Sequence, residues 1–388
     1  LKPYPLVSLP FATLPTKNNV MPFLIIIFGL MAISLSAFLI PKILVIAFRK
    51  RLFDVPDSRK DHVGAIPRLG GISFYPIIFF CFAFCEAIVI SFIAGNAGII
   101  ADPSLFIQIL LLFCGLILLY LIGITDDLIG VRYRKKFLVQ FLVAGFFPLG
   151  GLYINDLYGL FGIEAITPWI GIPLTLVFVV FITNAINLID GIDGLASGLC
   201  MVAFLTLGSF FFANQIWVLA LLSFITVGVL IPFFYYNVFG KAERCRKIFM
   251  GDTGSLTLGY LLSFLVISCC MYEHESYQTP SNMVIAFAPL LVPALDVIRV
   301  ILYRFRHHQS PFQPDRNHIH HKFLAMGFSH RQSMVLILLM SALFVVTNIG
   351  CTHFVNITLL FLADILIWTG LNIWFDKVRD AHQQRNPK

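Results

Sequence analysis

Long apolar runs, separated by short polar stretches, recur from residue 21 almost to the C-terminus. A helix needs about 20 predominantly apolar residues to cross the hydrocarbon core of a bilayer. Runs near that length lie at residues 21–47, 72–94, 104–124, 137–153, 168–186, 195–213, 216–236, 254–272, 283–303, 332–350 and 354–375. The fourth is the shortest. The pattern predicts an all-α, polytopic integral membrane protein with about eleven transmembrane helices.

The composition agrees with a membrane protein. Hydrophobic residues make up 59% of the chain and charged residues 12%, and the mean hydropathy is +0.88. A soluble domain cannot hide that much apolar surface. The eight cysteines include no C-x-x-C pair, so the sequence indicates neither a disulfide framework nor a zinc site.

Lysine and arginine gather in alternate loops, at residues 48–71, 125–136, 237–253 and 304–331, and in the C-terminal tail. The intervening loops hold none. By the positive-inside rule, the basic loops and the C-terminus are expected in the cytoplasm and the N-terminus outside. The net charge of +7 therefore reflects membrane topology, and we expect no nucleic-acid partner.

The domain organisation follows from the same pattern. Residues 1–20 are rich in proline and lack periodicity, and Met21 opens the first apolar run. We interpret residues 1–20 as a disordered leader or a mis-called start. Residues 21–376 are expected to form a single transmembrane domain with cytoplasmic catalytic loops, and residues 377–388 a cytoplasmic tail.

A row of polar side chains follows the fifth apolar run. Residues Asn184, Asn187, Asp190 and Asp193 recur at a spacing of three, with no lysine or arginine nearby in the sequence. Such a cluster at a membrane surface is costly unless it holds a cation, and oxygen ligands of this kind suit Mg²⁺. The alternative is a polar loop that caps the next helix, but capping needs only one such residue.

Two further acidic motifs lie in expected cytoplasmic loops. Asp126 and Asp127 follow the third run, where the C-terminal end of a helix disfavours negative charge. They could be catalytic, or a solvated pair that meets basic residues of the same loop. Asp252 opens the eighth run in a Gly-Asp-Thr-Gly-Ser stretch. It could bind a metal–phosphate group, cap the helix, or do both.

Cations and histidines gather in two loops. The loop after the ninth run holds Arg316, His318, His320 and His321, which favour an anion clamp over a metal site because Arg316 and Lys322 would repel a divalent cation. The alternative is a basic loop attracted to anionic lipid. Lys60 in the first loop, with His62 and Arg68, could line an anionic site or serve only as topogenic charge.

Charged residues inside the apolar runs are few. Asp296 and Arg299 are three residues apart and can pair on one helical face. We expect this pair to support the nearby histidine loop. Glu86 and Asp364 have no evident partner in the sequence.

At these motifs the chain resembles the polyprenyl-phosphate N-acetylhexosamine-1-phosphate transferases, a group within glycosyltransferase family 4. The resemblance runs from about residue 52 to residue 328. It is carried by Pro67-Arg-Leu-Gly-Gly, Asp126-Asp127, the block from Asn184 to Leu195 and the block from Phe249 to Ser255. A fifth block, His318-Ile-His-His321 followed by residues 327–332, resembles the branch that transfers N-acetylglucosamine 1-phosphate and starts cell-surface polysaccharides.

The resemblance implies that an N-acetylhexosamine 1-phosphate, with N-acetylglucosamine the favoured sugar, moves from a UDP-sugar to undecaprenyl phosphate. It implies an active site on the cytoplasmic face of the bacterial inner membrane, and it suggests a homodimer. By the family pattern Asp252 and Asn187 would ligate Mg²⁺, with Mn²⁺ as an alternative ion. Catalytic roles would fall to Asp126, Asp127 and Asp190, and substrate binding to Asn184, Asp193, Lys60, Arg316, His318, His320 and His321. Lys135 or Lys136 would contact a phosphate, and the family pattern does not choose between these two lysines.

Two questions stay open at this level. The lipid phosphate could attack directly, or a covalent intermediate could form on the Asp126-Asp127 pair. A transporter is the main alternative function, since its topology would look the same, but no inverted repeat is evident. The polar row also argues against a membrane scaffold without activity.

Overall fold

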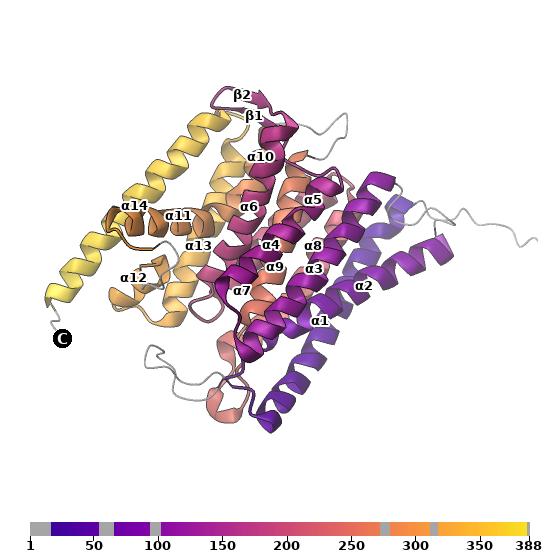
Figure 1. The fold of residues 1–388 in the computed structure, drawn as a ribbon, viewed down its shortest axis with the longest axis horizontal. Coiled ribbons are helices and arrows are strands. Elements are labelled where there is room, and N and C mark those ends of the chain that lie inside the picture. The colour runs from indigo at the N-terminus through magenta and orange to yellow at the C-terminus, as the bar shows by residue number, and fades with distance from the viewer. Residues whose placement is uncertain (1–16, 54–65, 94–101, 272–279, 311–316, 386–388) are drawn as a thin grey trace, which may run out of the picture.

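The computed structural model describes residues 17–53, 66–93, 102–271, 280–310 and 317–385, and it is almost entirely helical (Figure 1). Short 3-10 or π turns join several of the helices. The helices are α1 (Lys17–Lys50), α2 (Phe74–Ile88), α3 (Pro103–Ile129), α4 (Tyr133–Ala144), α5 (Phe146–Leu149), α6 (Pro168–Ile189), α7 (Leu195–Ala213), α8 (Trp217–Phe239), α9 (Gly251–Met271), α10 (Pro280–Phe287), α11 (Leu291–Arg306), α12 (Ile319–Ala325), α13 (His330–Cys351) and α14 (Ile357–Arg385).

Ten segments of this described part are long and apolar enough to cross a membrane. They correspond to ten of the predicted runs, which confirms the all-α polytopic fold. The predicted fourth span at 137–153 differs, because the helix breaks at Gly145 into α4 and the four-residue α5. Pro148 lies within α5, and basic residues occupy the first turn of α4. Neither piece alone reaches the length that a bilayer requires.

Helical structure extends across the positions predicted as boundaries near the two chain ends. Most of the expected leader lies outside the described residues, while α1 already begins at Lys17. The expected tail is largely helical, because α14 continues to Arg385. The hairpin of β1 (Asp156–Leu160) and β2 (Ile163–Ala165) lies at the opposite end of the molecule from the C-terminus (Figure 1).

Helix α9 lies at the centre of the bundle. Its apolar window is completely buried, and it packs against α3, α6 and α7. Two glycines allow its first turn to be approached closely. A Cβ added at Gly123 of α3 would lie 2.5 Å from the Thr253 Cα, and one at Gly71 would lie 2.1 Å from the Gly254 nitrogen. Small residues thus bring three distant segments together at the start of α9.

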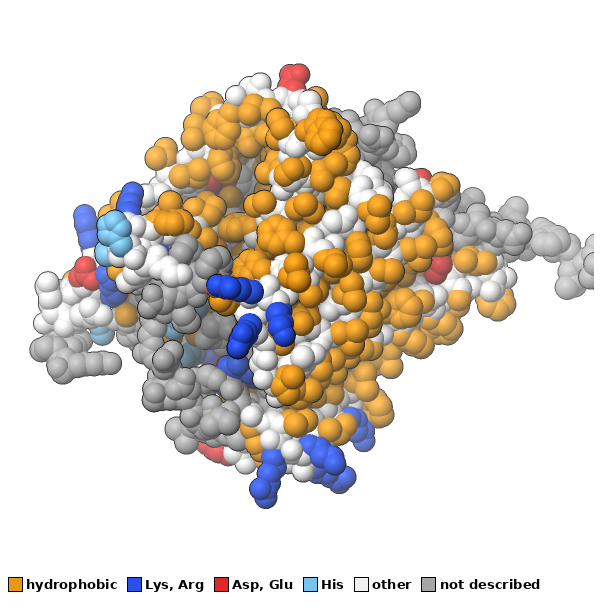
Figure 2. Space-filling view, in the orientation of Figure 1, with side chains coloured by type: hydrophobic (Ala, Val, Ile, Leu, Met, Phe, Trp, Pro, Cys, Tyr) orange, Lys and Arg blue, Asp and Glu red, His pale blue; other side chains and the backbone are white. Residues whose placement is uncertain are grey.

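The outer surface suits a lipid environment. Hydrophobic side chains cover the broad face over α2, α3 and α4, and Lys and Arg gather toward its lower part (Figure 2). Large apolar side chains such as Phe92, Ile129 and Trp169 are strongly exposed. The protein is therefore a multi-pass membrane protein.

Candidate active site

Two neighbouring polar pockets lie near the C-terminal ends of α3 and α6 and the N-terminal end of α9. The main pocket has a volume of about 320 Å³ and is lined by Arg68, Asn187, Asp190, Gly191, Ile192, Asp193, Asn237, Phe249, Gly251, Asp252, His321, Leu324 and His330. The side pocket, of about 400 Å³, is lined by Arg51, Leu52, Phe53, Arg68, Leu69, Asp126, Asp127, Leu128 and Gly130. Arg68 lines both pockets.

Lys136 joins two of the predicted acids. Its Nζ atom donates to Asp252 Oδ2 at 2.6 Å and to Asp126 Oδ2 at 3.0 Å. Burial lowers the pKa of Lys136, but the carboxylates of Asp252 and Asp126 outweigh this effect and raise the pKa above its usual value. Lys136 therefore stays charged and holds two mutually repelling carboxylates together. Its neighbour Lys135 is exposed on α4.

Asp127 caps the start of α9. Its Oδ1 atom accepts from the Asp252 N–H at 2.8 Å, and its Oδ2 atom accepts from the N–H and the hydroxyl of Thr253 at 3.0 and 2.6 Å. These donors include backbone groups of the first helical turn, which have no partner within the helix. Asp127 therefore fixes the position of Asp252 without facing the main pocket.

The two asparagines of α6 have different surroundings. Asn187 donates to Ser255 Oγ at 2.8 Å, lies within hydrogen-bonding reach of Asp252 and lines the main pocket. Asn184 points elsewhere, because its Nδ2 donates to Gln140 Oε1 of α4 at 2.6 Å and to the Val180 carbonyl. Asn184 thus links α4 to α6 and does not line either polar pocket.

The acids that follow α6 lie in the main pocket. Burial, with the nearby carboxylates of Asp252 and Asp193, raises the pKa of Asp190 to about 7. Asp193 forms an ion pair with Lys247 through Oδ2. Its Oδ1 atom is buried and has no hydrogen-bond donor among the described residues. The pocket therefore offers an unused acceptor, for which a ligand N–H or O–H is a suitable partner.

Backbone hydrogen bonds position Arg68 and Phe249. The Gly70 and Gly71 N–H groups donate to the carbonyls of Phe249 and Met250, both at 2.9 Å, and the Phe249 N–H donates to the Pro67 carbonyl at 2.9 Å. This short ladder holds Arg68 beside Phe249 at the edge of the main pocket.

The histidines occupy three different environments. His318 is buried and its Nδ1 contacts Asp296 Oδ2 at 2.8 Å. His320 is 1% exposed, and its ring lies so close to Gly191 that a Cβ there would be 2.2 Å from Nε2. Of these three histidines, only His321 lines the main pocket. Lys322 points away from the pocket toward α14, where it contacts Asp376.

Two predicted residues, Lys60 and Arg316, lie outside the described residues. Four polar or aromatic residues of the main pocket were given no role by the family pattern: Arg68, Asn237, Phe249 and His330. The sequence had suggested only that Arg68 could line an anionic site. Arg68, Phe249 and His330 lie in the sequence motifs described above, so the motifs could have identified them as site residues. Asn237 lies in none of these motifs. Its place at the pocket follows from two hydrogen bonds, because it accepts from the Gly194 N–H at 2.6 Å and donates to the Ile248 carbonyl at 2.8 Å.

The donor set can be compared with the expected metal. No group of three or more His, Cys, Asp or Glu side chains within the described ranges is arranged as a metal cluster. The residues that do converge are the carboxylates of Asp252 and Asp126 and the amide of Asn187. Magnesium sites on phosphate substrates use one or two carboxylates and take further ligands from the phosphates and water. The set therefore fits Mg²⁺ bound together with a phosphate ligand.

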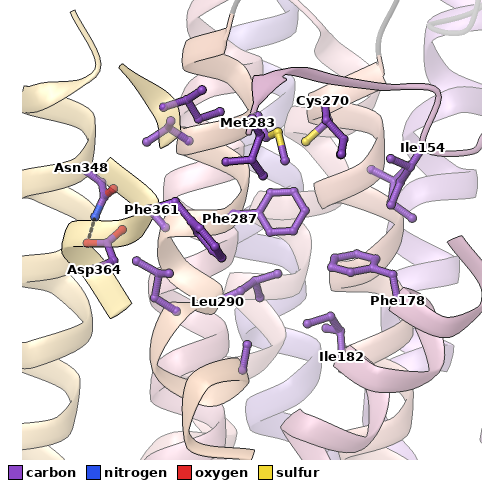
Figure 3. Close-up of a pocket in the computed structure, with 18 of the residues that line it drawn as sticks. Ile154, Phe178, Ile182, Cys270, Met283, Phe287, Leu290, Asn348, Phe361 and Asp364 are labelled. Carbon is purple, nitrogen blue, oxygen red and sulfur yellow. Dashed lines mark hydrogen bonds between the residues drawn. The ribbon is translucent and has the colours of Figure 1, made fainter. Parts of the chain in front are cut away.

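An apolar cavity of about 320 Å³ lies apart from these pockets, between α6, α9, α10, α11 and α14 (Figure 3). Its wall follows α6 from Leu174 to Ile182. Asp364 has a partner here, since Asn348 Nδ2 donates to its Oδ1 at 3.0 Å. The cavity offers hydrocarbon contacts within the membrane-spanning part of the protein.

These features define a polytopic membrane protein with a carboxylate and cation site suited to phosphate groups. The profile of glycosyl transferase family 4 matches residues 109–270. The chain is 33% identical over 305 residues to the undecaprenyl-phosphate alpha-N-acetylglucosaminyl 1-phosphate transferase of Yersinia pestis, covering 77% of this chain and 76% of the relative. It is 33% identical to the Escherichia coli K12 transferase of the same name, covering 80% of each chain. A probable undecaprenyl-phosphate N-acetylglucosaminyl 1-phosphate transferase of Bacillus subtilis is 32% identical, covering 85% of this chain and 82% of the relative.

The chain belongs to glycosyl transferase family 4. The resemblance seen in the motifs is thereby confirmed.

Proposed function

We propose that the protein transfers N-acetylglucosamine 1-phosphate from UDP-N-acetylglucosamine to undecaprenyl phosphate and releases UMP. The observation that carries the proposal is the convergence of Asp126, Lys136, Asn187 and Asp252 at the edge of a polar pocket. The names of the relatives support the lipid acceptor and the sugar phosphate. The basic loops support a cytoplasmic active site.

The main pocket is the proposed nucleotide-sugar site. Asp193 Oδ1 is placed to accept a hydrogen bond from the base, and Phe249 offers an aromatic face beside it. Arg68 and His321 lie on the same pocket and can donate to diphosphate oxygens. In this arrangement the diphosphate would lie toward Asp252.

Asp252 and Asn187 are the proposed magnesium ligands, and Asp126 lies close enough to contribute. A bound Mg²⁺ would neutralise part of the charge on the diphosphate. Lys136 neutralises the acids around it and offers a cation to a substrate phosphate. Asp190 lies within the electrostatic reach of Asp252 and supports the same site.

The geometry favours direct attack. Both oxygens of Asp127 are occupied by hydrogen bonds from the start of α9, and Asp126 is bound to Lys136 and the Val131 N–H. In direct attack a lipid phosphate oxygen bonds to the sugar-bearing phosphorus. The bond from that phosphorus to the oxygen shared with the uridine-bearing phosphate breaks, and UMP leaves with the electron pair. The apolar cavity could receive part of the hydrocarbon chain of the acceptor.

The test is UMP release by purified protein from UDP-N-acetylglucosamine, with and without undecaprenyl phosphate and with Mg²⁺ or a chelator. We expect release only when both the lipid and Mg²⁺ are present, and its loss in Asp252→Ala. Release from a different UDP-sugar would change the donor but keep the reaction. Folded protein that releases no UMP from any UDP-sugar would refute the proposal.

A further inference from the structure

The short helix α12 carries His320 and His321, and only seven residues form it. A helix of this length is not stable alone in water. Its position must therefore come from its contacts with neighbouring helices. Two polar anchors, one near each end of α12, supply these contacts.

The first anchor is Asp296 of α11, whose side chain is fully buried. Its Oδ1 atom accepts from the Ile319 N–H at 3.1 Å and from Arg299 Nη2 at 2.8 Å, and its Oδ2 atom accepts from His318 Nδ1 at 2.8 Å. Because a carboxylate only accepts, the proton of His318 resides on Nδ1. Asp296 thus fixes both the first residue of α12 and the ring that precedes it.

The second anchor is Lys322, which is 4% exposed. Its Nζ atom donates to Asn372 Oδ1 at 3.1 Å and to Asp376 Oδ2 at 3.0 Å. Both partners belong to α14. Burial and the nearby Arg299 lower the pKa of Lys322, and the carboxylate of Asp376 opposes this effect by stabilising the ammonium group.

The length of α14 explains why it can reach α12. Its 29 residues span about 43 Å, which exceeds the hydrocarbon thickness of about 30 Å. The last turns therefore extend beyond the membrane core, and they carry Asp376, Arg379 and Asp380. In Figure 1 this end of α14 projects beside α12. A second ion pair between Arg379 and Asp376 holds the carboxylate in place on its own helix.

We propose that Asp376, acting through Lys322, is a positioning residue for the nucleotide-sugar pocket. The end of α14 sets the place of α12 and so the place of His321 in the main pocket. The proposal rests on the proposed function, because the pocket it concerns is the donor site. It assigns a role to a segment that none of the transferase motifs contains.

The test compares Asp376→Asn with Asp380→Asn in full-length protein. Asp380 lies on the same helix, is more exposed and pairs only with Arg379 among the described contacts. We expect Asp376→Asn to raise the KM for UDP-N-acetylglucosamine roughly tenfold, with kcat and the KM for the lipid within about threefold, because the Lys136–Asp252 pair is untouched. Asp380→Asn should match the wild type, and Asp376→Glu should restore most of the donor affinity.

A second variant distinguishes a loss of folding from a loss of positioning. Removing one partner leaves a buried charge unpaired, whereas removing both does not. The double variant Lys322→Met with Asp376→Asn should therefore fold, as judged by thermal unfolding, and still show the raised donor KM. A wild-type donor KM in either folded variant would overturn the proposal.

The proposed function and this inference can fail separately. Wild-type protein that releases no UMP would refute the function alone. Thermal stabilisation by UMP or by UDP-N-acetylglucosamine would then report on the pocket directly. A loss of that stabilisation in Asp376→Asn but not in Asp380→Asn would support the positioning role, and equal stabilisation in both would refute it.

Discussion

The Lys136 ammonium lies 2.6 Å from Asp252 Oδ2, although the two residues are 116 positions apart in the chain. The pair joins the first turn of α4 to the first turn of α9. Because Lys136 also contacts Asp126, one cation connects the acids that the sequence predicted in separate motifs.

The first prediction concerns this cation. Lys136→Met should reduce kcat/KM at least about a hundredfold, because it removes positive charge from a site where substrate phosphates carry the reaction. Lys135→Met is the matched control, since its side chain is exposed one position earlier, and its activity should stay within about twofold. UMP release measures both. Equal losses in the two variants would contradict the assignment.

The second prediction concerns Asp127. In Asp127→Asn one oxygen becomes an amide group that cannot accept from the start of α9, so unfolding should become easier by about 1–2 kcal/mol. Thermal unfolding in detergent measures this change. Asp102→Asn, at the N-cap of α3, should cost much less because asparagine caps a helix equally well there. An unchanged melting temperature with abolished activity would instead support a chemical role for Asp127.

The third prediction uses two glycines in membrane helices. Gly123→Ala would place a Cβ 2.5 Å from the Thr253 Cα, so α3 and α9 would have to separate at the site. We expect a destabilisation of about 1–3 kcal/mol and a marked loss of activity. Gly350→Ala has no atom within 4 Å and should be neutral or stabilising by up to about 1 kcal/mol. The measurements are thermal unfolding and UMP release.

The fourth prediction concerns acid stability. Burial lowers the pKa of His320 to about 3, helped by His321, His318 and His330 and opposed by Asp296. The unfolded chain takes up a proton near pH 6.5 that the folded chain does not. The free energy of unfolding is therefore unaffected by this group above pH 6.5. It decreases as the pH falls toward 3, by about 1.4 kcal/mol at pH 5.5.

The comparison that isolates this effect is wild type against His320→Gln. Thermal unfolding between pH 8 and pH 5.5 should show a larger decrease for the wild type, because the variant lacks the titrating ring. All other titratable groups are common to the two proteins, so their contributions cancel in the comparison. Parallel decreases would show that His320 is not held neutral.

The sequence was sufficient for the helices because hydropathy and length are local properties. It failed at α4 and α5, where Gly145 and Pro148 interrupt a run that hydropathy reads as continuous. The break shortens the helix without changing the number of apolar residues in the run. The shortened α4 packs beside α3 and α6, contacts that the hydropathy of the run does not reveal.

The site was predicted in part. Asn187, Asp190, Asp193, Asp252 and His321 converge on one pocket as their motifs suggested. The directions of the other side chains depend on which helices are neighbours, which the motifs do not contain.

Three residues show this dependence. Asn184 faces Gln140, Asp127 faces the start of α9, and Lys322 faces α14. The choice between the two lysines of α4 depends on the rotation of that helix. Lys60 and Arg316 stay predictions.

The burial of α9 has a consequence for biosynthesis. Its hydroxyl-bearing residues, among them Thr257, Ser263 and Ser268, are buried in protein and do not meet lipid. Such a segment partitions less readily into a bilayer by itself than its neighbours do. Of the helices that pack against it, α3, α6 and α7 are synthesised earlier and α10 later. Most of the protein surface that buries α9 is therefore synthesised before α9 itself, so α9 can insert against helices that are already in the membrane.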